Sequence, residues 1–121
     1  MKLLYDLTIY IYFFLLKCVA PFNDKAADFL LGRQHFFWLE IPEKEPQTIR
    51  YWFHVASLGE FEQCRPVIEA LKKEQLPIEI ILTFFSPSGY EVQKNYGKAD
   101  WVGYIPIDQY PLASQFVQQI N

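Results

Sequence analysis

The stretch that decides the fold runs from Tyr51 to Lys73 and reads YWFHVASLGEFEQCRPVIEALKK. Its first part is apolar, rich in aromatic and β-branched residues and bounded by Ser57 and Gly59, which is typical of a buried strand. From Glu60 onward apolar residues recur at helical spacing before two lysines, which predicts an amphipathic helix. A strand, a tight turn and a helix place the turn at the carboxyl edge of a sheet, where open α/β folds bind ligands. Glu60 is therefore a candidate catalytic carboxylate. The apolar positions of the helix are Phe61, Val67, Ile68 and Leu71.

The same turn also has a purely structural explanation. Ser57-Leu58-Gly59-Glu60 fits a capping box, in which the serine hydroxyl accepts a first-turn amide and the glutamate reaches back to the amide of the cap. The helix dipole favours a negative charge at this point by up to about 1 kcal/mol. The residues alone leave both roles of Glu60 open.

The alternation of strands and helices continues to the end of the chain. Strands alternating with helices predict a parallel sheet with right-handed crossovers. Three such units make half of a doubly wound domain, so we expect a partial Rossmann-like α/β fold with one sheet edge uncovered. The predicted elements are a strand at 49–56, a helix at 59–74, a strand at 78–84, a helix at 88–96, a strand at 101–106 and a helix at 109–120.

The N-terminus is strongly apolar from Leu3 to Phe22 and predicts a membrane-anchoring helix over residues 1–22. The unbroken apolar core, Ile9–Leu16, is short for a membrane span of about 20 residues, so a spanning helix and an interfacial helix both stay open. A buried core helix is a further alternative, and a proline after the nearest small-residue site disfavours a cleaved signal peptide. If the helix spans, the basic residues that follow the apolar run place the globular part in the cytoplasm by the positive-inside rule.

Residues 23–47 are expected to form a membrane-proximal segment and a linker. The pattern predicts a short helix with Asn23 or Asp24 as its cap and Gly32 as its stop. An aromatic cluster at 36–38 fits either a core or a lipid-facing patch. Ile41–Gln47 is polar and bounded by prolines, which is typical of a linker. Residues 48–121 then form the incomplete Rossmann-like domain.

Composition limits what the chain can be. A length of 121 residues suits one small domain, and a net charge of −3 argues against nucleic acid as a partner. The two cysteines, Cys18 and Cys64, have neither metal-ligand spacing nor a disulfide pattern, and Cys64 is predicted to be a small buried thiol. His54 and His35 are isolated, so we expect packed residues rather than catalysts. No metal site is predicted.

A second strand-to-helix turn, Ser86-Pro87-Ser88-Gly89, is expected on the same edge of the sheet. Free amides and hydroxyls there suit a phosphate or a sugar hydroxyl, and a serine-capped helix with proline at its first position fits equally well. Arg65 is expected to pair with Glu62 or Glu69 at helical spacing, with a phosphate contact as the alternative.

These motifs together resemble a known family. The block HVASLGEFEQCRPVIEALKK, residues 54–73, is similar to the N-terminal domain of bacterial 3-deoxy-D-manno-octulosonic acid (Kdo) transferases. Further similar motifs follow in the family's order, and the similarity covers nearly the whole chain. They are Ile81–Glu91, Asn95–Lys98 and Tyr104–Asp108, with a weaker match at Lys25 and Gly32-Arg33.

The resemblance implies a glycosyltransferase of the GT-B type, which transfers Kdo from CMP-Kdo to a lipid A precursor during lipopolysaccharide biosynthesis at the bacterial inner membrane. It implies no cofactor, and it places the donor site in a second domain, so this chain alone is expected to be inactive. Alternatives are a non-catalytic membrane-bound α/β binding module and a different GT-B sugar transferase.

The resemblance also assigns roles to individual residues. Glu60 matches the family's general base, and Gly59 is expected to allow close backbone approach and an unusual dihedral in the turn. Thr83 fits only part of the family's Thr/Ser pattern, because Phe84 and Phe85 follow it. The expected substrate-binding residues are Ser57, Gly59, Ser86, Ser88 and Gly89.

Overall fold

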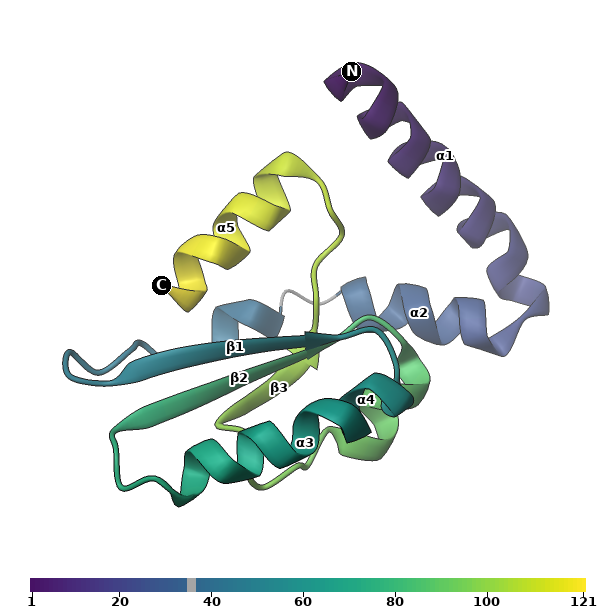
Figure 1. The fold of residues 1–121 in the computed structure, drawn as a ribbon. Coiled ribbons are helices and arrows are strands. Elements are labelled where there is room, and N and C mark those ends of the chain that lie inside the picture. The colour runs from purple at the N-terminus through teal and green to yellow at the C-terminus, as the bar shows by residue number, and fades with distance from the viewer. Residues whose placement is uncertain (35–36) are drawn as a thin grey trace.

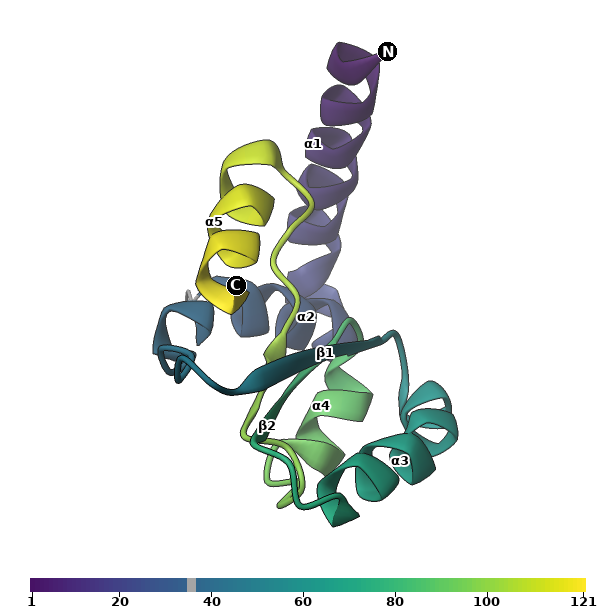
Figure 2. The same ribbon diagram turned by 60° about the vertical axis from the view of Figure 1, so that its left-hand side comes forward.

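The computed structural model describes residues 1–34 and 37–121 and contains a three-stranded parallel sheet in the order β1-β2-β3. Helices α3 and α4 cover one face of the sheet, and α5 lies on the opposite face (Figures 1 and 2). The expected mixed α/β architecture with a parallel sheet is confirmed. The bounds are β1 Ile49–Val55, α3 Leu58–Lys73, β2 Ile78–Phe84, α4 Pro87–Gln93, β3 Trp101–Tyr104 and α5 Tyr110–Ile120.

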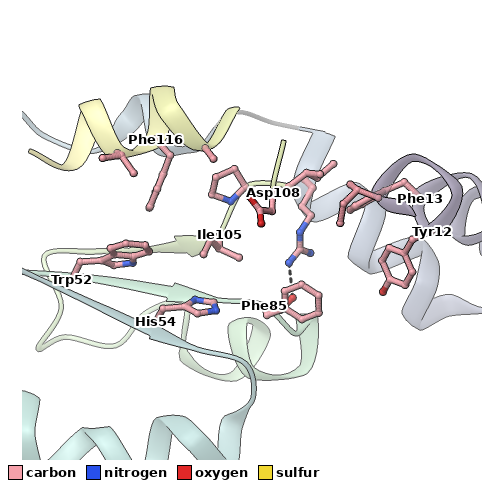
Figure 3. A pocket seen from close by; sticks show the side chains of 14 residues that line it. Tyr12, Phe13, Trp52, His54, Phe85, Ile105, Asp108 and Phe116 are labelled. Atoms are coloured by element: carbon pink, nitrogen blue, oxygen red, sulfur yellow. Dashed lines mark hydrogen bonds between the residues drawn. The ribbon is translucent and has the colours of Figure 1, made fainter. Parts of the chain in front are cut away.

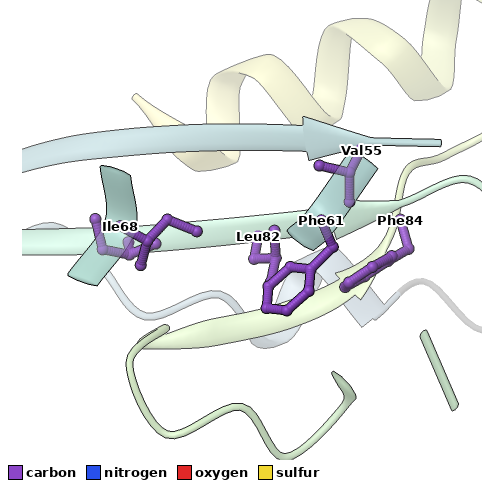
Figure 4. Close-up of a cluster of buried hydrophobic side chains, with 6 residues drawn as sticks. Val55, Phe61, Ile68, Leu82 and Phe84 are labelled. Atoms are coloured by element: carbon purple, nitrogen blue, oxygen red, sulfur yellow. The ribbon is translucent and has the colours of Figure 1, made fainter. Parts of the chain in front are cut away.

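The two faces of β2 build two separate cores. Alternate side chains of a strand point to opposite faces, so Ile80, Leu82 and Phe84 pack under α3 while Ile81 faces α5. On the α3 face these residues meet Phe61, which is fully buried (Figure 4). A central strand buried on both sides reads as a continuous apolar run, which is why the predicted bounds of β2 agree with the structure.

Strand β1 is not the buried strand that its apolar sequence predicts. Only Val55 is buried, whereas Trp52 is 42% exposed. The reason is topological, because β1 pairs with β2 alone among the described strands and so lies at the edge of the sheet. Strand β3 also pairs with β2 alone among the described strands, so the sheet has an uncovered edge at β3 as well as at β1. Val67 of α3, predicted on the apolar face, is also exposed at 53%.

The N-terminal part consists of α1 (Lys2–Val19), a short η1 (Ala20–Phe22) and α2 (Asp24–Gln34). The predicted cap is confirmed, since the Ala26 N–H donates to Asn23 Oδ1 over 3.1 Å. Gly32 is wrong as a stop, because α2 continues to Gln34. A Cβ at Gly32 would lie 2.3 Å from Tyr104 Cε2, so this glycine lets the helix pack closely against the aromatic ring.

The helical segment Lys2–Phe22 is long and apolar enough to cross a membrane, with a mean hydropathy of 1.7, and none of the segment is buried. It nevertheless touches the rest of the molecule along one side. The Tyr5 hydroxyl donates to the Asp108 carboxylate, Lys2 Nζ lies 4.4 Å from the Tyr110 ring centre, and Phe13 packs on Phe29. The other side of α1 is exposed and apolar.

The segment before β1 is only partly a free linker. Ile41 is 2% exposed and packs with Ile81 and Phe116, so the first residue of the predicted linker belongs to the core under α5. A short helical turn, η2 (Phe37–Glu40), precedes it. His35 and the side chains of the aromatic cluster at 36–38 lie outside the described residues.

Candidate functional site

The turn after β1 holds Glu60 by two hydrogen bonds that cap α3. The Glu60 N–H donates to Ser57 Oγ over 3.3 Å, as the capping box predicts. The carboxylate differs from the prediction, since Glu60 Oε2 accepts from the Ala56 N–H at 2.6 Å, one residue before the cap. The Glu60 residue therefore bonds to Ser57 through its backbone and to Ala56 through its carboxylate, and these two bonds span the turn.

One carboxylate oxygen of Glu60 is left for other chemistry. The side chain is exposed, and its Oε1 makes no hydrogen bond with another described residue. Because Oε2 is fixed by a backbone amide, the orientation of the free oxygen is restricted before any ligand arrives. Capping and a catalytic role are therefore compatible in this geometry.

Gly59 occupies the second position of α3 with an ordinary backbone. No described glycine has a positive φ, so the expected unusual dihedral is wrong, because the first turn of a helix needs only right-handed angles. A Cβ at this position would meet only Ser57 Oγ, at 3.8 Å. The space beside Gly59 is open on the outer side of the turn.

The two turns singled out by the sequence lie side by side. The Ser86 N–H donates to the Ala56 carbonyl over 2.9 Å, and the Phe85 N–H donates to the Val55 carbonyl over 3.0 Å. The segment after β2 is thereby tied to the segment that carries Glu60. Parallel strands bring their carboxyl ends to one edge, which is why these distant motifs meet.

Within the second turn, the serines and the glycine have different surroundings. The Ser86 and Ser88 hydroxyls are hydrogen-bonded to each other over 2.7 Å, and Ser86 makes no side-chain cap to α4. Both line a small pocket of about 370 Å³ together with Lys25. Gly89 is buried instead, and a Cβ there would lie 2.7 Å from a Phe84 ring carbon.

Thr83 does not face this turn. It is fully buried, and its hydroxyl contacts Trp52 Nε1 at 2.9 Å and His54 Nδ1 at 3.0 Å. His54 is thus hydrogen-bonded to a neighbour across the sheet, but the residue is exposed and lines a cavity, so the expected packed histidine is confirmed only in its hydrogen bond. Burial lowers the pKa of His54, and the charge of Glu60 partly opposes this shift.

Two further expectations concern α3. Arg65 pairs with Glu62 over 2.6 Å, as its helical spacing predicts, and its guanidinium stacks on Phe61. Cys64 is only half-buried, so it is less enclosed than predicted, and desolvation raises the pKa of its thiol.

Sequence reasoning missed an apolar pocket at this edge. A cavity of about 420 Å³ lies between α1, the ends of the strands and α5 (Figure 3). Its walls are mainly aromatic and aliphatic, and its polar side chains are Arg33, His54 and Asp108. No local pattern predicts it, because its lining comes from six separate parts of the chain.

Comparison with protein families gives one clear match. The family described as 3-deoxy-D-manno-octulosonic-acid transferase (kdotransferase) matches residues 32–121, which include both turns, the sheet and α5. Comparisons with curated proteins and with solved structures give no match. The matched range begins at Gly32 and thus contains Arg33 but leaves out α1.

Proposed function

Because the chain belongs to the Kdo transferase family of glycosyltransferases, we propose that it forms the acceptor side of an enzyme that transfers Kdo from CMP-Kdo to a lipid A precursor. The reaction belongs to lipopolysaccharide synthesis. The apolar α1 anchors the domain at the inner membrane, where such a lipid acceptor resides, and the proposal places the globular part on the cytoplasmic side.

Glu60 acts as the general base in this proposal. Transfer of a sugar requires the acceptor hydroxyl to lose its proton as the oxygen attacks the sugar carbon and the nucleotide phosphate leaves. The observation that carries the proposal is the exposed Oε1 of Glu60, free of hydrogen bonds to described residues while Oε2 is anchored on the Ala56 amide. A carboxylate oxygen of restricted orientation suits proton removal from one particular hydroxyl.

The neighbouring turns supply the acceptor contacts. Ser57 and Gly59 border the carboxylate, and the Ser86 and Ser88 hydroxyls lie on the adjoining turn, which Ser86 joins to Ala56. Gly89 contributes by its small size, since it lets α4 approach the end of β2. Hydroxyls so placed favour a polyhydroxyl ligand. The proposal assigns no metal or cofactor to these residues.

The proposal assigns no donor site to residues 1–121, because the family resemblance places CMP-Kdo binding in another domain. We therefore expect this chain alone to show no turnover when it is incubated with CMP-Kdo and a lipid A precursor. Clear product formation by the isolated chain would contradict that assignment.

The test of Glu60 uses the complete enzyme that carries residues 1–121. Glu60→Gln keeps an oxygen for the Ala56 N–H but cannot take a proton, so we expect activity to fall by about 10²–10⁴-fold. Glu62→Gln is the matched control, because this exposed glutamate lies on the same helix and its ion pair among the described residues is with Arg65. Activity should then change little.

Two outcomes would redirect the proposal. If Glu60→Gln kept full activity, Glu60 would be only a cap, and the chain would be a binding module. If activity were lost but a different sugar acceptor or donor proved better in a substrate panel, the enzyme would be another GT-B transferase.

A further inference from the structure

Arg33 is a buried cation without an anionic partner among the described residues. The residue is 8% exposed, and its guanidinium donates to the Phe29 carbonyl over 3.2 Å and to the Phe85 carbonyl over 2.7 Å. The second of these bonds is the dashed line in Figure 3. The ion pairs in the described part of the chain involve other basic side chains, and none involves Arg33. Those basic residues are Arg50, Arg65, Lys72 and Lys94.

The surroundings of Arg33 hold the group but do not neutralise it. Its guanidinium lies 3.7 Å from the Phe29 ring centre and 5.0 Å from that of Phe85. Carbonyls and aromatic rings stabilise a cation only partly, and an uncompensated buried charge is costly. Burial accordingly lowers the pKa of Arg33 to about 10. An arriving anion would relieve this cost.

The cavity beside Arg33 is built for an apolar group. Trp52 and Phe116 form one end, their rings 5.3 Å apart, and Tyr12 and Phe13 of α1 lie at the other (Figure 3). A volume of about 420 Å³ falls in the range of small-ligand sites. Asp108 also lines the cavity, but its carboxylate is engaged by the Tyr5 hydroxyl.

The wall made by α1 connects the cavity with an apolar surface. Ile9, Tyr12 and Phe13 line it, while the opposite side of the same helix is exposed and apolar. A small inorganic anion would not need aromatic walls, and a neutral chain would leave Arg33 uncompensated. We infer that this cavity binds an anionic amphiphile, whose apolar chain lies between α1 and α5 and whose phosphate or carboxylate group meets Arg33.

This inference is separate from the role of Glu60, which does not line the cavity. Ligand binding tests the cavity, and turnover tests the role of Glu60. Either proposal can therefore fail while the other holds. If the proposed function holds, the amphiphile class includes the lipid acceptor.

The experiment measures quenching of tryptophan fluorescence by brominated ligands, with the 121-residue chain held in neutral phosphatidylcholine nanodiscs. Three probes share one chain and differ in the head group: ω-bromododecyl phosphate, ω-bromododecanol and ω-bromododecyltrimethylammonium. Trp52→Phe identifies the signal, because Trp52 lines the cavity. We expect the phosphate to bind at least about tenfold more tightly than either other probe, and inorganic phosphate in excess not to displace it.

Two pairs of variants locate the site. Ala113→Phe fills the cavity and should weaken binding of the phosphate probe by about tenfold or more, whereas Ala70→Phe on the exposed side of α3 should not. Arg33→Gln should remove the preference for phosphate over alcohol, and Arg65→Gln should retain it. Circular dichroism checks that each variant is folded.

Several results would overturn the inference. They are equal binding of the three probes, displacement by inorganic phosphate alone, binding that Ala113→Phe leaves unchanged, and no quenching of Trp52. Should Arg33→Gln fail to fold, the ranking of the probes on the unaltered chain and the Ala113→Phe result still decide the matter.

Discussion

At the scale of single residues, Gly89 lies where α4, the end of β2 and the start of α3 meet. A Cβ at Gly89 would stand 2.7 Å from a Phe84 ring carbon and 3.1 Å from the backbone nitrogen of Leu58. Gly89→Ala is expected to lower the free energy of unfolding by about 1–3 kcal/mol, the usual range for overpacking. Gly97→Ala is the control, because a Cβ at Gly97 would meet nothing within 4 Å, and it should change stability by less than about 0.5 kcal/mol. Urea unfolding measures both, and equal stabilities would contradict the close packing.

The hydroxyl of Thr83 determines the tautomer of His54. A threonine hydroxyl has one hydrogen and two lone pairs, the Trp52 Nε1–H can only donate, and the Phe53 carbonyl can only accept. All contacts of the hydroxyl are satisfied together if it donates to Phe53 O and accepts from Trp52 and from His54 Nδ1–H. The neutral ring then leaves Nε2 as an acceptor on the cavity side. We expect nitrogen NMR shifts of His54 to report this Nδ1–H form, and an Nε2–H form would contradict the network.

The lowered pKa of His54 predicts how the stability of the folded protein changes with pH. Burial lowers this pKa in the folded protein, so the unfolded chain takes up the proton more readily. The stabilisation from the neutral ring is complete above the unfolded pKa of about 6.5 and is lost as pH falls from there through the folded pKa. Urea midpoints should therefore decrease below about pH 6.5, and His54→Gln should reduce that decrease. A His54 resonance that titrates above the free-histidine value would contradict the sign.

At the scale of elements, the starts of α3 and α4 look alike in sequence but differ in structure. Ser57 Oγ accepts the Glu60 amide, whereas Ser86 bonds to Ser88 and makes no side-chain cap. Ser57→Ala should therefore lower stability by about 1 kcal/mol, and Ser86→Ala should have a much smaller effect. Thermal unfolding of the two variants checks this difference, and equal losses would mean that the capping bond contributes nothing.

The elements also show which features the sequence can predict. The bounds of β2 and the cap at Ser57 follow from local patterns, and the structure confirms both. The local pattern makes Gly32 look like a helix stop. The position needs a glycine because the Tyr104 ring, which lies far along the chain, leaves no room for a Cβ. The exposure of β1 depends on which strands lie beside it, a property of the topology that its own apolar residues do not encode.

The candidate site also contains residues that a local sequence pattern predicts and residues that no such pattern predicts. Ser57 and Glu60 stand out because a turn between a strand and a helix has a recognisable pattern, and the family match covers it. The cavity beside Arg33 has no such pattern, because its walls come from segments as distant as Phe13 and Phe116. Only the packing of α1 and α5 against the sheet brings these segments together.

At the scale of the whole molecule, the contacts of α1 bear on how the chain sits at a membrane. An α-helix rises about 1.5 Å per residue, so the ends of α1 are about 27 Å apart. Were α1 to cross a bilayer with the domain outside, Lys2 and Tyr5 would lie far from the domain. In the structure Lys2 stacks on Tyr110, the first residue of α5, and Tyr5 bonds to Asp108 just before that helix.

The arrangement therefore favours an α1 that lies in the membrane interface. One side of this helix packs against the domain, and the other side contacts lipid. With Cys18 and Cys64 replaced by alanine, the pair Tyr5→Cys and Asp108→Cys should be joined by a bifunctional thiol cross-linker as long as a tyrosine and an aspartate side chain end to end, because those two side chains touch at their tips. The pair Tyr5→Cys and Asn95→Cys is the control and should not, since Asn95 follows α4 on the opposite face of the sheet. A spanning helix predicts the reverse for the first pair: no cross-link, and labelling of Cys at position 5 only from the far side of the bilayer.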